Sequence, residues 1–242
     1  MERLLVVDDG SAASGSALEW AASRARRGQA RIDILSADPG GEGAPEGTAA
    51  PGGLLVVGVD HGRASPAVVP GIATLPFGAV AVVVVPAGWV ATADPVTVGV
   101  ADDDSSADAL AFAAREAEAD RVPMRLVHAW LMPTPPFPRA PGEASDHPGQ
   151  TPDEAMEQHR GALAAAAASV GRTHPRVDVL CELIRDSRSA ALLRFGPRSS
   201  LIVVGTHRRG PYADQLLGAV AQGIARQAPC PVAFVPVTGG RA

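Results

Sequence analysis

Two stretches of this 242-residue sequence decide its fold. Residues 4–38 read LLVVDDGSAASGSALEWAASRARRGQARIDILSAD, and residues 96–130 read VTVGVADDDSSADALAFAAREAEADRVPMRLVHAW. They align without a gap at a constant offset of 92 residues, and in both an apolar run precedes an alanine-rich segment and a second apolar run. Each stretch therefore predicts a strand, a helix and a strand, and the chain contains an internal repeat.

A second pair of apolar runs extends the repeat. Residues 54–58 (LLVVG) align with residues 201–205 (LIVVG), and in each copy a later β-branched run is closed by a proline, at 80–86 and at 232–236. Short, continuous apolar runs that alternate with amphipathic or alanine-rich segments are typical of a parallel sheet covered by helices on both faces. We therefore predict an α/β fold.

The later copy is the longer of the two. A loop at 133–152 holds seven prolines and is not expected to form regular structure. Beyond it the pattern predicts a helix at 153–170 that ends at Gly171. A strand at 177–184 and a short helix at 186–195 follow. This copy is therefore expected to form a βαβαβαβαβ unit.

The earlier copy is trimmed. A linker at 36–53, with six glycines and three prolines, stands where the later copy has a helix, a strand and a helix. Four strands therefore remain in the earlier copy. We expect two tandem open parallel-sheet domains of the Rossmann-like class, at residues 1–90 and 91–242, with the first trimmed to four strands.

Composition excludes several classes of protein. All 21 basic residues are arginine, and neither lysine nor asparagine occurs. Schiff-base enzymes and Walker-type phosphate loops need a lysine amine, so both are excluded. The net charge of -5 provides no overall attraction to nucleic acid or to an anionic membrane.

Targeting signals are not expected either. The apolar run at 79–87 is far shorter than the roughly 18 residues that a membrane helix needs. The first residues lack the basic segment with which a signal peptide begins. We therefore expect a cytoplasmic protein that binds neither nucleic acid nor a membrane.

No catalytic residue is predicted, and no histidine is predicted as a zinc ligand. The hydrolase motif Gly-x-Ser-x-Gly is absent, and the histidines at 128, 147, 159 and 174 do not have the spacing of zinc ligands. We therefore expect a protein that is not an enzyme. Three aspartates at 102–104 have two interpretations: they cap the helix that follows, or they bind a divalent cation.

Local motifs add a family resemblance. They are DGS at 9–11, ALEWA at 17–21, RLVHAW at 125–130, LGAVA at 217–221 and APCPV at 228–232. With these motifs the chain resembles, over nearly its whole length, the universal stress protein family in the tandem two-domain form common in high-GC bacteria. The resemblance implies the sheet order 3-2-1-4-5 in each domain, so the strand missing from the first domain is an edge strand.

The same resemblance implies how the domains and the cysteines are placed. The final strands of the two domains should pair and form an intrachain pseudo-dimer, with residues 82–85 and 232–235 buried against each other. Cys181 and Cys230 should lie at opposite edges of one sheet, reduced and unpaired. A homodimer of the whole chain is a further candidate assembly.

ATP-binding members of the family share a loop after strand four, Gly-x2-Gly-x9-Gly-Ser/Thr. In it, glycine lets the backbone approach phosphate and the hydroxyl binds it. In the second domain Gly205 and Gly218 keep this spacing, but Arg208 and Ala219 replace the second glycine and the hydroxyl. The resemblance therefore implies an altered nucleotide site there.

The first domain departs from the motif in the same way. Gly58 and Gly71 keep the spacing, whereas His61 and Ile72 replace the second glycine and the hydroxyl. The aspartate that the family places near the adenosine survives as Asp9. We predict a vestigial site made of Asp9, Gly58 and Gly71.

The loop that follows Gly205 offers a replacement for the lost phosphate ligands. Arginine binds phosphate bidentately without any lysine. The candidate cofactor-binding residues of the second domain are therefore Gly205, His207, Arg208, Arg209 and Gly218, with ATP as the candidate cofactor. The alternative interpretation is an exposed basic loop that binds no ligand.

Three functional hypotheses follow. The first is a non-catalytic universal stress-type protein, a scaffold that binds a protein partner or a small ligand and has degenerate nucleotide sites. The second is an ATP- or AMP-binding stress sensor that uses the second domain, with slow hydrolysis of ATP as an open alternative. The third is binding of a different small molecule at the carboxyl ends of the strands, where open α/β sheets place their ligands.

Overall fold

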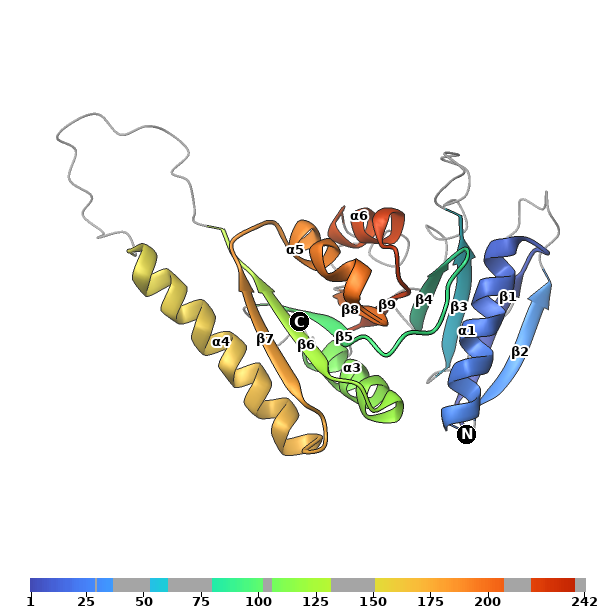
Figure 1. The fold of residues 1–242 in the computed structure, drawn as a ribbon, viewed down its shortest axis with the longest axis horizontal. Coiled ribbons are helices and arrows are strands. Elements are labelled where there is room, and N and C mark those ends of the chain that lie inside the picture. The colour runs from blue at the N-terminus through green and yellow to red at the C-terminus, as the bar shows by residue number, and fades with distance from the viewer. Residues whose placement is uncertain are drawn as a thin grey trace, which may run out of the picture.

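The structure is a computed structural model that describes residues 1–28, 30–36, 53–60, 80–101, 106–131, 151–206 and 219–237. Within these ranges nine strands form one sheet, in the order β2-β1-β3-β4-β9-β8-β5-β6-β7 (Figure 1). Helices lie on both faces of this sheet, which confirms the predicted α/β class. No helix of the described ranges is long and apolar enough to cross a membrane.

The first half of the sheet contains four parallel strands in the described ranges. They are β1 (Arg3–Asp8), β2 (Arg31–Ser36), β3 (Leu54–Val59) and β4 (Ala81–Pro86). Numbered as in a five-stranded domain, the order β2-β1-β3-β4 is 2-1-4-5. Among the described residues strand three has no counterpart and strand two forms the edge, which agrees with the implied trimming; residues 37–52 of the linker lie outside the described residues.

Helix α1 (Ala12–Gly28) connects β1 to β2 and packs on the first half of the sheet. Its buried apolar residues are Ala13, Ala17, Trp20 and Ala21, a spacing of three to four that places them on one side of a helix. Trp20 is only 3% exposed and joins the main core cluster. The apolar periodicity of this segment therefore explains both the helix and the face that it buries.

The second half follows the predicted βαβαβαβαβ pattern. Its elements are β5 (Val96–Val100), α3 (Ala107–Asp120), β6 (Met124–Ala129), α4 (Pro152–Thr173), β7 (Val179–Ile184), α5 (Arg188–Phe195), β8 (Leu201–Thr206), α6 (Ala219–Gln227) and β9 (Val232–Pro236). The short 3-10 helix η3 (Gly196–Arg198) lies between α5 and β8. The order β9-β8-β5-β6-β7 is 5-4-1-2-3, as the resemblance implies.

Helix α4 differs from its predicted bounds at both ends. Thr151 caps it: the Thr151 hydroxyl accepts from the backbone N of Glu154 at 3.2 Å, and the Glu154 carboxylate accepts from the backbone N of Thr151 at 2.8 Å. Pro152 is therefore in the first turn and not in the loop. The predicted end at Gly171 is wrong, because the helix continues to Thr173; a glycine lowers helix stability by only about 1 kcal/mol and does not stop it.

The two halves meet at their final strands. β4 pairs with β9 in the antiparallel sense, with Val83 opposite Ala233, Val82 opposite Phe234 and Val84 opposite Val232. All of these side chains are at most 1% exposed. The expected pairing of the final strands is therefore present, and it makes one continuous sheet of the two halves (Figure 1).

Two apolar cores cover the two faces of this sheet. On one face α1 packs over strands of the first half and α3 and α4 pack over strands of the second half; on the other face α5 and α6 pack over strands of the second half. Parallel strands buried on both faces need apolar residues at successive positions. This requirement is met by the runs at 54–57, 82–85 and 201–204, which explains why the strand patterns were visible in the sequence.

The two cysteines are free, as expected. Cys181 is exposed on β7, at one edge of the sheet, and Cys230 is buried just before β9. The expected position of Cys230 at the opposite edge is wrong for the nine-stranded sheet, because β9 pairs with both β4 and β8 and is an interior strand. Burial raises the pKa of the Cys230 thiol to about 12. The thiol of this residue therefore stays protonated in the folded protein at pH values at which an unfolded cysteine ionises.

This difference predicts a loss of stability at alkaline pH. In the unfolded chain a thiol ionises with a pKa of about 8.5, so above this pH the unfolded state binds fewer protons than the folded state. The free energy of unfolding should be unaffected below this pH and then fall by about 1.4 kcal/mol per pH unit as pH rises toward the folded pKa. Urea unfolding at successive pH values measures this slope.

Two variants separate the Cys230 contribution from other alkaline titrations. Cys230→Ala should abolish most of the slope, whereas Cys181→Ser, at the exposed thiol, should keep it. The absence of lysine leaves this pH window free of lysine ionisation. An unchanged slope in Cys230→Ala would show that the buried thiol is not its source.

Candidate functional site

The predicted site residues belong to the carboxyl ends of the strands. Asp9 directly follows β1, Gly58 is the penultimate residue of β3, and Gly205 is the penultimate residue of β8. The remaining predicted residues lie outside the described residues; they are Gly71, His207, Arg208, Arg209 and Gly218. The aspartates at 102–104 and most of the proline-rich loop lie outside them as well.

In the first half, the two aspartates at the end of β1 accept hydrogen bonds from the residues that follow them. Asp8 Oδ1 accepts from the backbone N of Gly10 at 3.0 Å and from the hydroxyl of Ser14 at 2.7 Å. Asp9 Oδ1 accepts from the backbone N of Ser11 at 3.0 Å. The hydrogen bond from the Ser14 side chain lowers the pKa of Asp8, and hydrogen bonds from the side chain and the backbone N of Ser11 lower the pKa of Asp9, so both are carboxylates at neutral pH.

These contacts form the turn into α1. Gly10 has a positive φ of 73°, which suits glycine, and the hydroxyl of Ser11 accepts from the backbone N of Ser14 at 3.1 Å. Backbone N–H groups in the first turn of a helix lack partners within the helix. Here the Ser11 hydroxyl satisfies one of them, and the two carboxylates hold the turn that precedes it.

Gly58 lies directly beneath this turn. A Cβ atom at Gly58 would overlap the carbonyl group of Ala13 and would lie 2.6 Å from the backbone N of Ser14. The missing side chain therefore makes room for the first turn of α1 against β3. The structure assigns Gly58 a packing role, which the sequence motif alone did not indicate.

In the second half, a histidine pair lies at the same level of the sheet as Gly205. Val98 and Val203 are in register on β5 and β8, so that Val100 and Gly205 come two residues later on each strand. His128 is opposite Val100 on β6 and is fully buried. Its Nδ1 lies 2.9 Å from the Val100 carbonyl oxygen, and its Nε2 lies 2.8 Å from Nδ1 of His159 on α4.

The tautomer of His128 follows from its contact with the Val100 carbonyl oxygen. A carbonyl oxygen accepts only, so Nδ1 of His128 carries a proton and donates to Val100. When both rings are neutral, Nδ1 of His159 donates to Nε2 of His128. The sequence predicted that His128 lies in a buried strand, but not this partner, because a long proline-rich segment separates the two histidines.

Trp130 and Arg185 extend the histidine pair at the carboxyl ends of β6 and β7. The ring centroids of Trp130 and His159 are 5.3 Å apart, and the Arg185 guanidinium lies 5.7 Å from the centroid of a Trp130 ring. Flat aromatic and guanidinium groups of this kind can stack on a nucleic acid base. Among the described residues, no group of three or more histidine, cysteine, aspartate or glutamate side chains could hold a metal ion.

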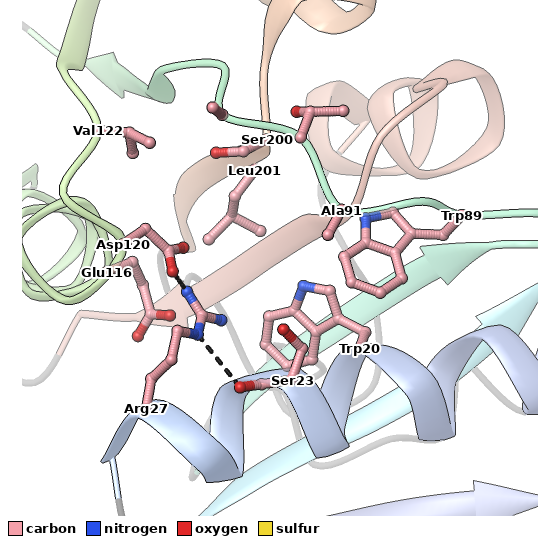
Figure 2. A pocket seen from close by; sticks show the side chains of 12 residues that line it. Trp20, Ser23, Arg27, Trp89, Ala91, Glu116, Asp120, Val122, Ser200 and Leu201 are labelled. Atoms are coloured by element: carbon pink, nitrogen blue, oxygen red, sulfur yellow. Dashed lines mark hydrogen bonds and ion pairs between the residues drawn. The ribbon is translucent and has the colours of Figure 1, made fainter.

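A cavity of about 200 Å³ lies between the two halves (Figure 2). Trp20 and Trp89 line one side of it, and Arg27 pairs with Asp120 across it. The hydroxyl oxygen of Ser200 is buried there without a hydrogen-bond partner among the described residues. The complete lining is Trp20, Ser23, Arg27, Trp89, Ala91, Thr92, Ala93, Glu116, Asp120, Val122, Ser200 and Leu201.

Sequence reasoning did not find this cavity. Its walls come from α1, from the segment after β4, from α3 and from the start of β8. No local motif joins these segments, because they meet only when β4 pairs with β9.

A comparison with protein families identifies the second half. The profile of the universal stress protein family matches residues 92–236. This chain belongs to the universal stress protein family. The first half of this universal stress protein lies outside that match, and it is related to the second half by the internal repeat and by the shared strand order.

Curated relatives carry the same family name. Universal stress protein Rv2623 of Mycobacterium tuberculosis is 30% identical over 138 residues, which are 57% of this chain and 43% of that protein. A universal stress protein of Thermus aquaticus is 30% identical over 132 residues, 54% of this chain and 90% of that protein. The match thus spans less than half the length of the mycobacterial relative.

Solved structures support the fold over nearly the whole chain. A universal stress protein from Archaeoglobus fulgidus has a TM-score of 0.65 and 14% identity, and the alignment covers 97% of this chain and 98% of that chain. A functionally unknown protein of Pseudomonas aeruginosa has a TM-score of 0.58 and 15% identity, with 97% and 82% covered. At these identities the likeness shows the fold alone.

Proposed function

We propose that this universal stress protein is a non-catalytic scaffold, whose two domains, residues 1–90 and 91–242, pair within the chain and bind a small ligand or a protein partner. The carboxyl ends of the first-half strands carry this proposal, because their polar groups serve the fold. Asp8 and Asp9 accept hydrogen bonds from the turn that begins α1. Gly58, in turn, is covered by the first turn of α1.

The cavity between the halves is the proposed place for a small ligand. Its volume of about 200 Å³ is below the roughly 300–1,000 Å³ of sites for drug-sized molecules, so only a compact molecule would fit. The two indoles supply apolar contact, and the Ser200 hydroxyl supplies a hydrogen-bonding group.

The exposed thiol of Cys181 suits the reducing cytoplasm, in which we place the protein.

One observation favours the nucleotide sensor as a second candidate. The stacking group of Trp130, His159 and Arg185 lies near the carboxyl ends of the second-half strands, where open α/β sheets bind ligands. In this proposal the base would stack on that group, and the phosphates of ATP would be bound by the residues predicted from the sequence, which are Gly205, His207, Arg208, Arg209 and Gly218.

Tryptophan fluorescence distinguishes the two sites. The chain has three tryptophans, of which Trp20 and Trp89 line the cavity between the halves and Trp130 lies beside the histidine pair. Protein is refolded to remove any bound nucleotide and is then titrated with ATP, ADP and AMP, with and without Mg²⁺. Emission is compared between the parent and Trp130→Phe, and the heat of binding is measured by isothermal titration.

The scaffold proposal predicts neither heat nor a change of emission with any nucleotide, and no release of phosphate from ATP. Micromolar binding that quenches the parent but not Trp130→Phe, and that is lost in Arg208→Ala, would establish the sensor instead. Hydrolysis of ATP by the refolded protein would overturn the non-catalytic assignment. Arg185→Ala removes the cation beside Trp130, so weaker nucleotide binding in this variant would also support the sensor.

A further inference from the structure

The two halves are related by an approximate twofold axis that passes through the strand junction. When the final strands are aligned on Pro86 and Pro236, Val83 and Ala233 occupy equivalent positions. These two residues are also partners in the antiparallel pair. Val82 pairs with Phe234 and Val84 pairs with Val232, as a twofold axis through the central pair requires. Equivalent residues of the two halves therefore meet at this axis.

Equivalent residues meet at a second place, between the helices. Arg24 on α1 and Glu116 on α3 differ by 92 positions, which is the offset of the internal repeat. The Nε of Arg24 lies 3.2 and 3.1 Å from the two carboxylate oxygens of Glu116, and its Nη2 lies 2.6 Å from Oε1. The side chains are only 12% and 7% exposed.

The sign of the charge at this position distinguishes the two halves. In a symmetric pair made from the first halves of two chains, Arg24 would meet Arg24; in a pair of second halves, Glu116 would meet Glu116. Two like charges that are withdrawn from water repel each other and lose their hydration. The apolar strand junction makes no such distinction, because Val83 would pack against a second Val83 without any charge.

We propose that the Arg24–Glu116 pair is the specificity determinant of this interface: it selects the unlike half as partner and rejects a second copy of the same half. The ion pair between Arg27 and Asp120 has the same polarity, with the cation on α1 and the anion on α3. Buried ion pairs often contribute little net stability compared with apolar residues, and their best supported role is the choice of partner and register. This inference concerns only the pairing of the halves and holds whichever ligand the protein binds.

Charge reversal in the full-length chain tests it. Glu2 also bonds to Arg24, so all proteins, the reference included, carry Glu2→Gln to prevent repulsion of a new glutamate at position 24. In Glu116→Arg two cations face each other, and in Arg24→Glu two anions do. Each variant alone should lose at least tenfold in its folding equilibrium constant, measured by urea unfolding.

Mixing the two variants should rescue both. When they are refolded together, the first half of the Glu116→Arg chain can pair with the second half of the Arg24→Glu chain, and the other two halves are complementary as well. We expect a 1:1 complex with twice the 24.6 kDa mass of one chain, detected by light scattering, and absent when either variant is refolded alone. A mixture that associates no more than its separate components would overturn the proposal.

The double reversal covers the case in which neither single variant folds. A chain with both Arg24→Glu and Glu116→Arg should regain most of the stability and the mass distribution of the reference. If it is no more stable than the single variants, charge complementarity at this position does not decide the pairing. Glu157→Arg, in an exposed ion pair with Arg160, is the matched control and should leave both readouts unchanged.

Discussion

Replacing Gly58 by valine is expected to leave the protein largely unfolded, and replacing it by alanine should cost about 3 kcal/mol or more. Overpacking a core site by flexible neighbours typically costs about 1–3 kcal/mol. Here the obstruction is the backbone of Ala13 and Ser14, which cannot rotate away as a side chain would. The total stability of a protein is about 5–15 kcal/mol, so it leaves little margin for the two further methyl groups of valine.

Gly15 provides the matched control for this prediction. It lies in the first turn of α1, it is exposed, and a Cβ there would have no atom within 4 Å. Gly15→Ala should therefore stabilise the protein by about 0.5–1 kcal/mol, because glycine is the weaker helix former. Urea unfolding followed by circular dichroism measures both variants. Equal stabilities of Gly58→Ala and the parent would show that α1 does not pack closely on β3.

Phe234→Ala should lower the free energy of unfolding by about 3–5 kcal/mol, the range measured for large core aromatic residues. Phe234 is fully buried on β9, opposite Val82 of the first half and Val204 of the second. The cavity that it leaves would adjoin both halves. We therefore expect one cooperative transition, shifted for the entire sheet rather than for the second half alone.

Two single-tryptophan proteins make this expectation measurable. One keeps Trp20, which reports on the first half, and the other keeps Trp130, which reports on the second. Phe234→Ala should shift the unfolding midpoint of both by the same amount. A shift confined to Trp130 would mean that the halves unfold independently. Phe234→Leu, which retains most of the volume, should cost less than about 1.5 kcal/mol.

Much of the fold could be predicted because its strands are buried on both faces. Runs such as those at 54–58 and 201–205 are apolar at successive positions, so they can be recognised without knowledge of their neighbours. The strand order came from the family resemblance, since periodicity does not specify which strands pair. The end predicted for α4 at Gly171 is wrong for a local reason. A single glycine is a weak stop signal when the following residues continue the helix.

Less of the candidate site could be predicted. The sequence motif at Gly58 predicts a vestigial phosphate loop, and the structure adds a packing role that depends on where α1 begins. The proposed nucleotide ligands after Gly205 stay predictions. The histidine pair and the cavity with the two indoles were not predicted, because their members come from segments that approach only in the folded chain.

The sequence by itself determined the repeat, the α/β class, the trimming of the first half and the absence of lysine chemistry. Each of these depends on residue types and on spacings along one segment. The tertiary structure alone decided that Arg24 meets Glu116, that His128 meets His159 and that Ala13 covers Gly58. Such contacts join residues that are distant in the chain, and the burial of apolar surface brings them together without leaving a local pattern that names the partner.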